Sequence, residues 1–268
     1  MFPVELPGYR KDRYKDHNSL LLEACSWLGI RRGRAQEYVR LLTEFHEQQK
    51  QTRQHILAYN ESCEVIDIYR FWLSKVDRFP GLRKKISNVL RSGPVLMEEE
   101  RAQRSNNRAR NDCFGYYLAG MLLAADLPVI AVDGVLEQKR SGIQSADITL
   151  LWGTDLVDIE CKRPQRWQAL AARAKEARKQ IEARNRTGVI AVDCSAMVRP
   201  PGGLLRSSSI AEANSFIVRS LQATSHQHLV KLRSKSLLGF LLFARIPVIT
   251  KIAKSNVITS QGQPLTYI

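Results

Sequence analysis

The sequence has few cysteines and no long uninterrupted apolar run. Its five cysteines are an odd set, without a CxxC pair or a Cys/His spacing typical of zinc sites. This pattern argues against a disulfide framework and a zinc finger, and it suits a reducing compartment such as the cytoplasm. The most apolar run, Leu237 to Thr250, contains Arg245 and Pro247 and is too short to span a bilayer. We therefore expect a soluble, cytoplasmic protein that does not bind a membrane.

Acidic residues are scarce relative to basic ones. The chain has 41 lysines and arginines against 26 aspartates and glutamates, so its net charge is +15 at pH 7. Solubility needs less charge than this, and the excess favours a polyanionic partner such as nucleic acid over a surface that is merely basic. The sequence also lacks a Gly-rich phosphate loop and a Gly-x-Ser-x-Gly elbow, so nucleoside triphosphatase and serine hydrolase chemistry have no motif here.

The length of 268 residues, with 44% apolar residues, allows one large or two modest domains. We expect a helical N-terminal module over residues 1–93 and an α/β domain over residues 94–268. Predicted helical segments are Asn18–Ile30, Arg34–Tyr59, Glu64–Leu73, Asp112–Ala125, Gln165–Asn185 and Ile210–Arg233. Leu82–Leu90 is a short basic segment that follows a break at Pro80-Gly81. Outside the hairpin described next, predicted strands are Val129–Val132, Val189–Asp193, Leu237–Phe243, Ile246–Ile249 and two short edge strands, Asn256–Thr259 and Leu265–Ile268, with a loop over Ala196–Ser209.

One stretch, Ala146 to Pro164, has the pattern of a tight β-hairpin. Two β-prone runs flank Gly153-Thr154, and a Gly-X pair between such runs predicts a two-residue turn. The turn determines the pairing register, because each residue before it faces one after it. The expected pairs are Trp152 with Asp155, Leu150 with Val157, Ile148 with Ile159, and Asp147 with Glu160.

The alternation of side chains divides this hairpin into an apolar face and a charged face. Asp147 and Glu160 would lie opposite each other on the charged face, and two carboxylates in that position repel. A divalent cation would offset the repulsion. Lys162 lies two residues beyond Glu160 on the same face, so an ammonium group would stand beside the two acids. A solvated hairpin with salt bridges is the alternative.

These residues resemble the signature of the PD-(D/E)xK, or restriction-endonuclease-like, nucleases, in which an Asp is followed by (Asp/Glu)-x-Lys. Asp147 and Glu160-Cys161-Lys162 match that pattern, with Ala146 where the Pro of the name would stand. The context is also similar: a helix precedes the signature, and a basic helix and a buried strand follow it. The resemblance covers roughly Asn106 to Ser195.

The resemblance implies a nuclease-like domain over residues 94–268, with a mixed central sheet flanked by helices, and a Mg²⁺- or Mn²⁺-dependent nuclease activity. Asp147, Glu160 and the Cys161 carbonyl would hold the ion, and Lys162 would orient or help deprotonate the attacking water. The family often has an acid on its first helix, and here Asp112 or the run containing Glu99 could supply it. Gln180 resembles a glutamine that several members place near the metal, with ordinary packing as the alternative. Cleavage would leave a 5′-phosphate and a 3′-hydroxyl.

A basic helix directly after the signature would place positive charge where a phosphate backbone passes. The candidate nucleic-acid contacts are Arg163, Arg166, Arg173, Arg178 and Lys179. DNA is the expected partner. Cutting both strands needs two sites, which favours a homodimer, and a partner protein in a larger complex is the alternative. The competing hypothesis is a catalytically inactive nucleic-acid-binding or complex-assembly protein that retains the nuclease fold.

Overall fold

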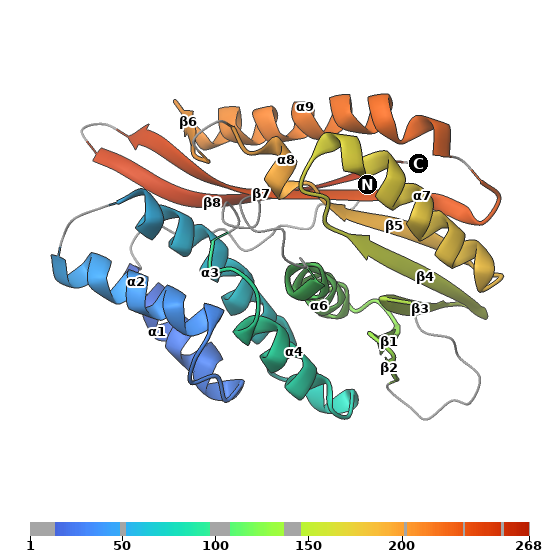
Figure 1. Cartoon of the computed structure of the whole chain (residues 1–268), viewed down its shortest axis with the longest axis horizontal. Coiled ribbons are helices and arrows are strands. Elements are labelled where there is room, and N and C mark those ends of the chain that lie inside the picture. Colours follow the sequence, from blue (N-terminus) through green and yellow to red (C-terminus); the bar gives the residue numbers. More distant parts are fainter. Residues whose placement is uncertain are drawn as a thin grey trace.

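The first part of the chain is helical (Figure 1). The computed structural model describes residues 14–48, 52–96, 108–136, 146–200, 203–232, 234–252 and 255–267. The described helices up to residue 96 are α1 (Tyr14–Trp27), α2 (Arg34–Gln48), α3 (Arg53–Trp72), the short 3-10 helix η1 (Val76–Arg78) and α4 (Leu82–Arg91). The predicted helical N-terminal region is therefore confirmed.

The prediction of one continuous segment over Arg34–Tyr59 is wrong, because a new helix begins at Arg53. Thr52 has extended backbone angles and caps α3. The Thr52 hydroxyl accepts a hydrogen bond from the His55 backbone N–H at 3.4 Å, and the His55 ring accepts one from the Thr52 N–H at 3.3 Å. This reciprocal pair satisfies two N–H groups that a helix start leaves without partners. The segment predicted at Glu64–Leu73 is the second half of α3.

A mixed β-sheet forms the centre of the rest of the molecule. Eight strands of the described residues belong to it, and all but the last follow the order β2-β1-β3-β4-β5-β7-β6, with β8 paired to β7. The strands are β1 (Val129–Val132), β2 (Val135–Leu136), β3 (Ile148–Trp152), β4 (Asp155–Lys162), β5 (Thr187–Asp193), β6 (Leu205–Ser207), β7 (Leu237–Ile252) and β8 (Ser255–Tyr267). Strands β1, β3 and β4 are antiparallel, whereas β4, β5 and β7 are parallel. The α/β class with a mixed central sheet is confirmed.

The β3–β4 hairpin has the predicted register in three of the four expected pairs. The fourth pair, Asp147 with Glu160, lies outside the ladder, because β3 begins at Ile148. Trp152 pairs with Asp155, Leu150 with Val157, and Ile148 with Ile159. Gly153 in the turn has φ of 62°, a left-handed conformation that glycine adopts without strain. The apolar face of the hairpin, with Ile148, Leu150 and Ile159, packs into the core. The residues that alternate with these point to the opposite face of the sheet.

Helices cover both faces of the sheet, and each face has its own apolar core. One core joins the N-terminal helices to α6 (Arg108–Ala124) and to the apolar face of the hairpin. The other joins α7 (Trp167–Ala183) and α9 (Ile210–His228) to β5 and β7. Figure 1 shows α7 and α9 above the sheet and the N-terminal helices below it. The short helices α8 (Ser195–Val198) and η2 (Val230–Leu232) lie in the connections.

The helical region packs closely against the α/β region. The Trp72 indole N–H donates to the Tyr116 carbonyl at 2.9 Å. A Cβ atom at Gly120 would lie 2.7 Å from Trp72 Nε1, so α3 and α6 approach each other at a glycine. The two regions thus share a core, and the boundary expected near residue 93 stays a prediction.

The C-terminal strands differ from the prediction. Strand β7 is continuous over 16 residues, where two strands were expected, and β8 is one strand of 13 residues in place of two short ones. Pro247 is tolerated because it falls between the part of β7 that pairs with β5 and the part that pairs with β6. The predicted loop Ala196–Ser209 contains α8 and β6. None of the helices in the described ranges is long and apolar enough to cross a membrane.

Candidate functional site

Asp147 and Glu160 lie close together at the end of the hairpin away from its turn. The Cys161 N–H donates to Asp147 Oδ2 at 2.7 Å, and the Asp133 N–H donates to the Asp147 carbonyl at 2.8 Å. Asp147 is thereby held between β1 and β4. Burial, followed by the neighbouring charge of Glu160, raises the pKa of Asp147 to about 6. The two predicted acids therefore come together with the like-charge repulsion that the register implied.

Lys162 stands beside Glu160, as the spacing predicts. Its Nζ lies 3.1 Å from Glu160 Oε2 and donates to Gln180 Oε1 at 2.9 Å. The Gln180 side chain comes from α7 and is exposed apart from this contact, so packing does not account for its position. The structure thus places Gln180 at the site.

An arginine that sequence reasoning did not assign to the site lies on the other side of Glu160. Arg184 follows the last turn of α7, and its Nη2 is 2.5 Å from Glu160 Oε1 while its Nε is 2.5 Å from Asp158 Oδ2. Arg186 adds a contact to Asp158 Oδ1 at 3.1 Å. Asp158 is fully buried, and a buried carboxylate requires a cationic partner. The signal in the sequence was Asp158 itself: it lies two residues before Glu160 on the same face, and an acid in a strand of the core indicates a cationic partner nearby.

Asp112 and Asp147 line the same small, partly open pocket. Asp133 and Cys161 also line it. Burial, followed by the charge of Asp133, raises the pKa of Asp112. Of the two upstream acids considered, Asp112 is thus placed at the site, and Glu99 lies outside the described residues.

The oxygen atoms around this pocket are of the kind that hard divalent cations bind. Carboxylates, a backbone carbonyl and water molecules suit Mg²⁺, which often takes only one or two carboxylates from a protein. In the part of the chain that the structure describes, no group of three His, Cys, Asp or Glu side chains is arranged to hold a metal ion. The Cys161 thiol is buried and burial raises its pKa, so its sulfur is not a ready metal ligand.

The basic residues predicted to contact nucleic acid divide into two groups. Arg166, Arg173 and Lys179 are exposed at the start of α7 or along it, and Arg178 is half-buried with its Nε 3.5 Å from Glu182. Arg163 is buried, which corrects its predicted role. Its Nε lies 3.1 Å from Asp193 Oδ2, and its Nη1 donates to the Arg110 carbonyl at 3.2 Å. A guanidinium held in this way is not presented to a phosphate backbone.

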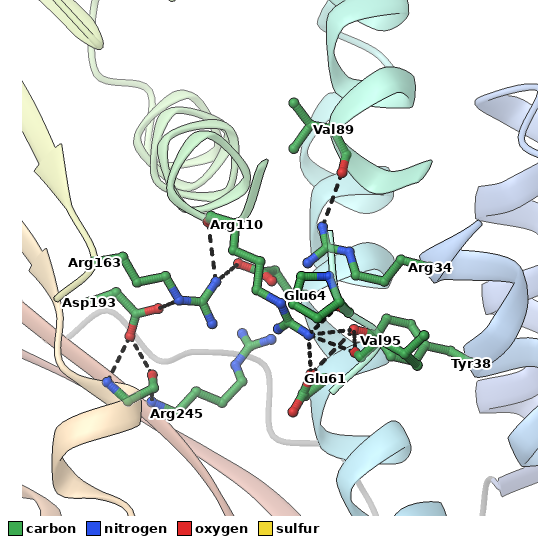
Figure 2. A network of polar contacts seen from close by, with 12 residues as sticks. Arg34, Tyr38, Glu61, Glu64, Val89, Val95, Arg110, Arg163, Asp193 and Arg245 are labelled. Carbon is green, nitrogen blue, oxygen red and sulfur yellow. Dashed lines mark hydrogen bonds and ion pairs between the residues drawn. The ribbon is translucent and has the colours of Figure 1, made fainter. Parts of the chain in front are cut away.

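Arg163 belongs to a buried polar network between α3, α6 and the sheet (Figure 2). Arg110 donates to Glu61 Oε2 at 2.7 Å, and Arg245 Nη2 lies 2.5 Å from Asp67 Oδ2. Residues far apart in the chain form these pairs, and no sequence spacing connects them. The network joins the helical region to the sheet.

Comparison with known proteins gives no relative for this chain. No protein-family model matches the sequence, and searches of curated proteins and of solved structures return no match. The functional assignment therefore depends on the arrangement of Asp147, Glu160, Lys162 and Gln180.

Proposed function

We propose that this protein is a metal-dependent nuclease of the restriction-endonuclease-like type, which hydrolyses phosphodiester bonds in DNA. One observation carries the proposal: Lys162 Nζ lies 3.1 Å from Glu160 Oε2 while Asp147 is bonded to the backbone of the residue between them. Two acids and a lysine therefore meet at one point of the hairpin. The net charge of +15 supports a polyanionic substrate.

The order of elements around this point supports the family resemblance. Helix α6 precedes the antiparallel strands β1, β3 and β4, and α7 then crosses to β5, which is parallel to β4. A helix before the signature, with a basic helix and a buried strand after it, is the context that the resemblance requires.

Each residue of the site has a role in this proposal. Asp147, Glu160 and the Cys161 carbonyl would hold Mg²⁺ or Mn²⁺, and Asp112 could contribute a further oxygen. The bound ion would neutralise charge on the phosphoryl oxygens and lower the pKa of a water molecule. Lys162 orients the attacking water and stabilises charge that develops on the phosphate. Gln180 holds the Lys162 ammonium in place, and exposed cations of α7 contact the backbone of the nucleic acid.

A second function has its own supporting observation. Arg184 and Lys162 each contact one oxygen of Glu160, so both oxygens already face a cationic group. A protein that no longer binds metal would be expected to neutralise its acids in this manner. The second candidate is therefore an inactive nucleic-acid-binding or complex-assembly protein with the same fold.

Cleavage assays separate the two candidates. Supercoiled plasmid, single-stranded DNA and RNA would be incubated with the protein and Mg²⁺, Mn²⁺ or a chelator. The nuclease proposal predicts metal-dependent cutting that Asp147→Ala and Lys162→Ala each reduce about 100-fold or more. Cutting that persists in both variants would indicate a contaminant. Binding without cutting, under every metal and substrate, would favour the inactive protein.

A further inference from the structure

Helix α4 of the N-terminal region has an unusual distribution of charge. Its ten residues, Leu82–Arg91, include four cationic side chains and no acid. The apolar residues Leu82, Ile86 and Leu90 are buried, and Arg83, Lys84 and Lys85 at its start are exposed. The charged side chains that this helix presents to solvent are therefore all cationic.

This surface reaches the edge of the candidate site. Lys85 Nζ donates to the Asp133 carbonyl at 2.6 Å and to Asp133 Oδ2 at 2.8 Å. Asp133 lines the same pocket as Asp112 and Asp147, and its backbone N–H donates to the Asp147 carbonyl. Asp133 thus connects Lys85 of α4 to Asp147, one of the proposed metal ligands.

The cations of α4 and those of α7 approach the site from opposite faces of the sheet. Helix α7 belongs to one core, and Gln180 on it contacts Lys162. Helix α4 belongs to the core on the other face and contacts the site through Lys85. Figure 1 shows α6 and the hairpin between the two helices. A polyanion bound at the pocket would have positive charge on two sides.

The partners of Arg83 leave its charge accessible. The Arg83 guanidinium carbon lies 4.8 Å from the centre of the Trp27 ring. Its Nη2 lies 3.7 Å from Oδ1 of Asp77, whose side chain is 92% exposed. Such a surface pair contributes little and is readily exchanged for another anion. Stacking on the ring orients the guanidinium and does not neutralise its positive charge.

We propose that the exposed face of α4, formed by Arg83, Lys84 and Lys85, is a second contact surface for the phosphate backbone of nucleic acid. The N-terminal helical region then takes part in holding the substrate across the site from α7. This inference rests on the proposed function, since it assigns a second wall to the same substrate-binding surface. Each contact with duplex DNA should contribute about 0.9 to the slope of log affinity against log salt concentration.

Fluorescence anisotropy with a labelled DNA duplex, in a chelator that prevents hydrolysis, tests the inference. Lys84→Gln should reduce the salt slope by about 0.9, and Arg83→Gln/Lys84→Gln by about twice as much, with roughly 10-fold weaker binding at low salt. Arg219→Gln is the matched control, because Arg219 is exposed on α9, a helix that Figure 1 shows on the other side of the sheet from α4. Unchanged thermal midpoints would show that the variants are folded.

The results distinguish the inference from the function on which it rests. In one outcome, Arg173→Gln/Lys179→Gln on α7 lowers the salt slope and the α4 variants match wild type. The inference that α4 contacts nucleic acid is then wrong, and the proposed function stands. A loss of the same size in Arg219→Gln would also overturn the inference, because the effect would then come from overall charge. If wild type binds neither duplex nor single-stranded nucleic acid, both proposals fail.

Discussion

Arg184 holds Glu160 from the end of α7, with its Nη2 2.5 Å from Glu160 Oε1. The same guanidinium contacts the fully buried Asp158. An ion that binds Glu160 must share the carboxylate with this arginine or displace it. Arg184 therefore weakens metal binding in the nuclease proposal, and it replaces the metal in the alternative.

Replacing Arg184 by glutamine should make Mg²⁺ bind about 10-fold more tightly, because a competing positive charge beside Glu160 is removed. Arg186→Gln is the control, since Arg186 pairs with Asp158. Both variants should lose roughly 1 to 3 kcal/mol of stability, since each removes a partner of a buried acid. Isothermal calorimetry with Mg²⁺ measures the affinity without reference to activity. Equal affinity in wild type and Arg184→Gln would contradict this view of the site.

The raised pKa of Asp147 predicts a pH-dependent effect of Asp147→Asn on stability. The pKa is about 6 in the folded protein against an ordinary value of 3.8, so the folded state favours the protonated acid. The folded state is thus favoured most at low pH, and this advantage is lost as the pH rises from about 4 through about 6. Without divalent ions, the variant should be roughly 1 to 2 kcal/mol more stable than wild type at pH 8 and about equal to it at pH 4.

Urea unfolding of both proteins at the two pH values provides the measurement. Asp155→Asn is a suitable control, because Asp155 is an exposed acid in the same hairpin. Added Mg²⁺ should raise the melting temperature of wild type at pH 8 and leave that of Asp147→Asn unchanged, since binding to the folded state stabilises it. A variant with the same stability difference at both pH values would argue against a buried charge at Asp147.

The contact between Gln180 and Lys162 predicts a moderate effect on cleavage. Gln180→Ala should reduce the rate about 10- to 100-fold with unchanged Mg²⁺ affinity, because the residue positions the lysine and does not hold the ion. Gln180→Glu keeps an oxygen acceptor for the ammonium and should recover part of the rate. Lys179→Ala, at the neighbouring exposed position, should affect nucleic-acid affinity and leave the rate at saturation unchanged. Equal rates for Gln180→Ala and wild type would remove Gln180 from the site.

The different burial of Arg163 and Arg173 predicts opposite effects. Arg163→Met should destabilise the protein by about 3 kcal/mol, because it leaves Asp193 buried without this partner, and it should not change the salt slope of nucleic-acid binding. Arg173→Gln should lower the salt slope and change stability by less than about 1 kcal/mol, since its pair with Glu176 is exposed. Denaturant unfolding and salt-dependent anisotropy give the two quantities. A lower salt slope in folded Arg163→Met would restore its predicted nucleic-acid role.

Much of the local structure could be predicted from local pattern. The turn at Gly153 and the alternation of side chains determine the hairpin register, because a shift of one residue would expose the apolar face. The periodic apolar stripe predicts α7, and the charged face predicts that Asp147, Glu160 and Lys162 lie together. These predictions succeeded because every interaction they need lies within about twenty residues.

The partners of the charged groups depended on the tertiary structure. Sequence pattern assigned Arg163 to the surface and gave Arg184 no role at the acids, yet Arg163 is buried against Asp193 and Arg184 contacts Glu160. Whether an arginine meets solvent or a buried carboxylate depends on how helices and strands pack. That packing is decided by the burial of apolar area over the whole chain and not by neighbouring residues. The sequence alone therefore determined which acids and which lysine could form a site, and only the folded chain determined which cations stand against them.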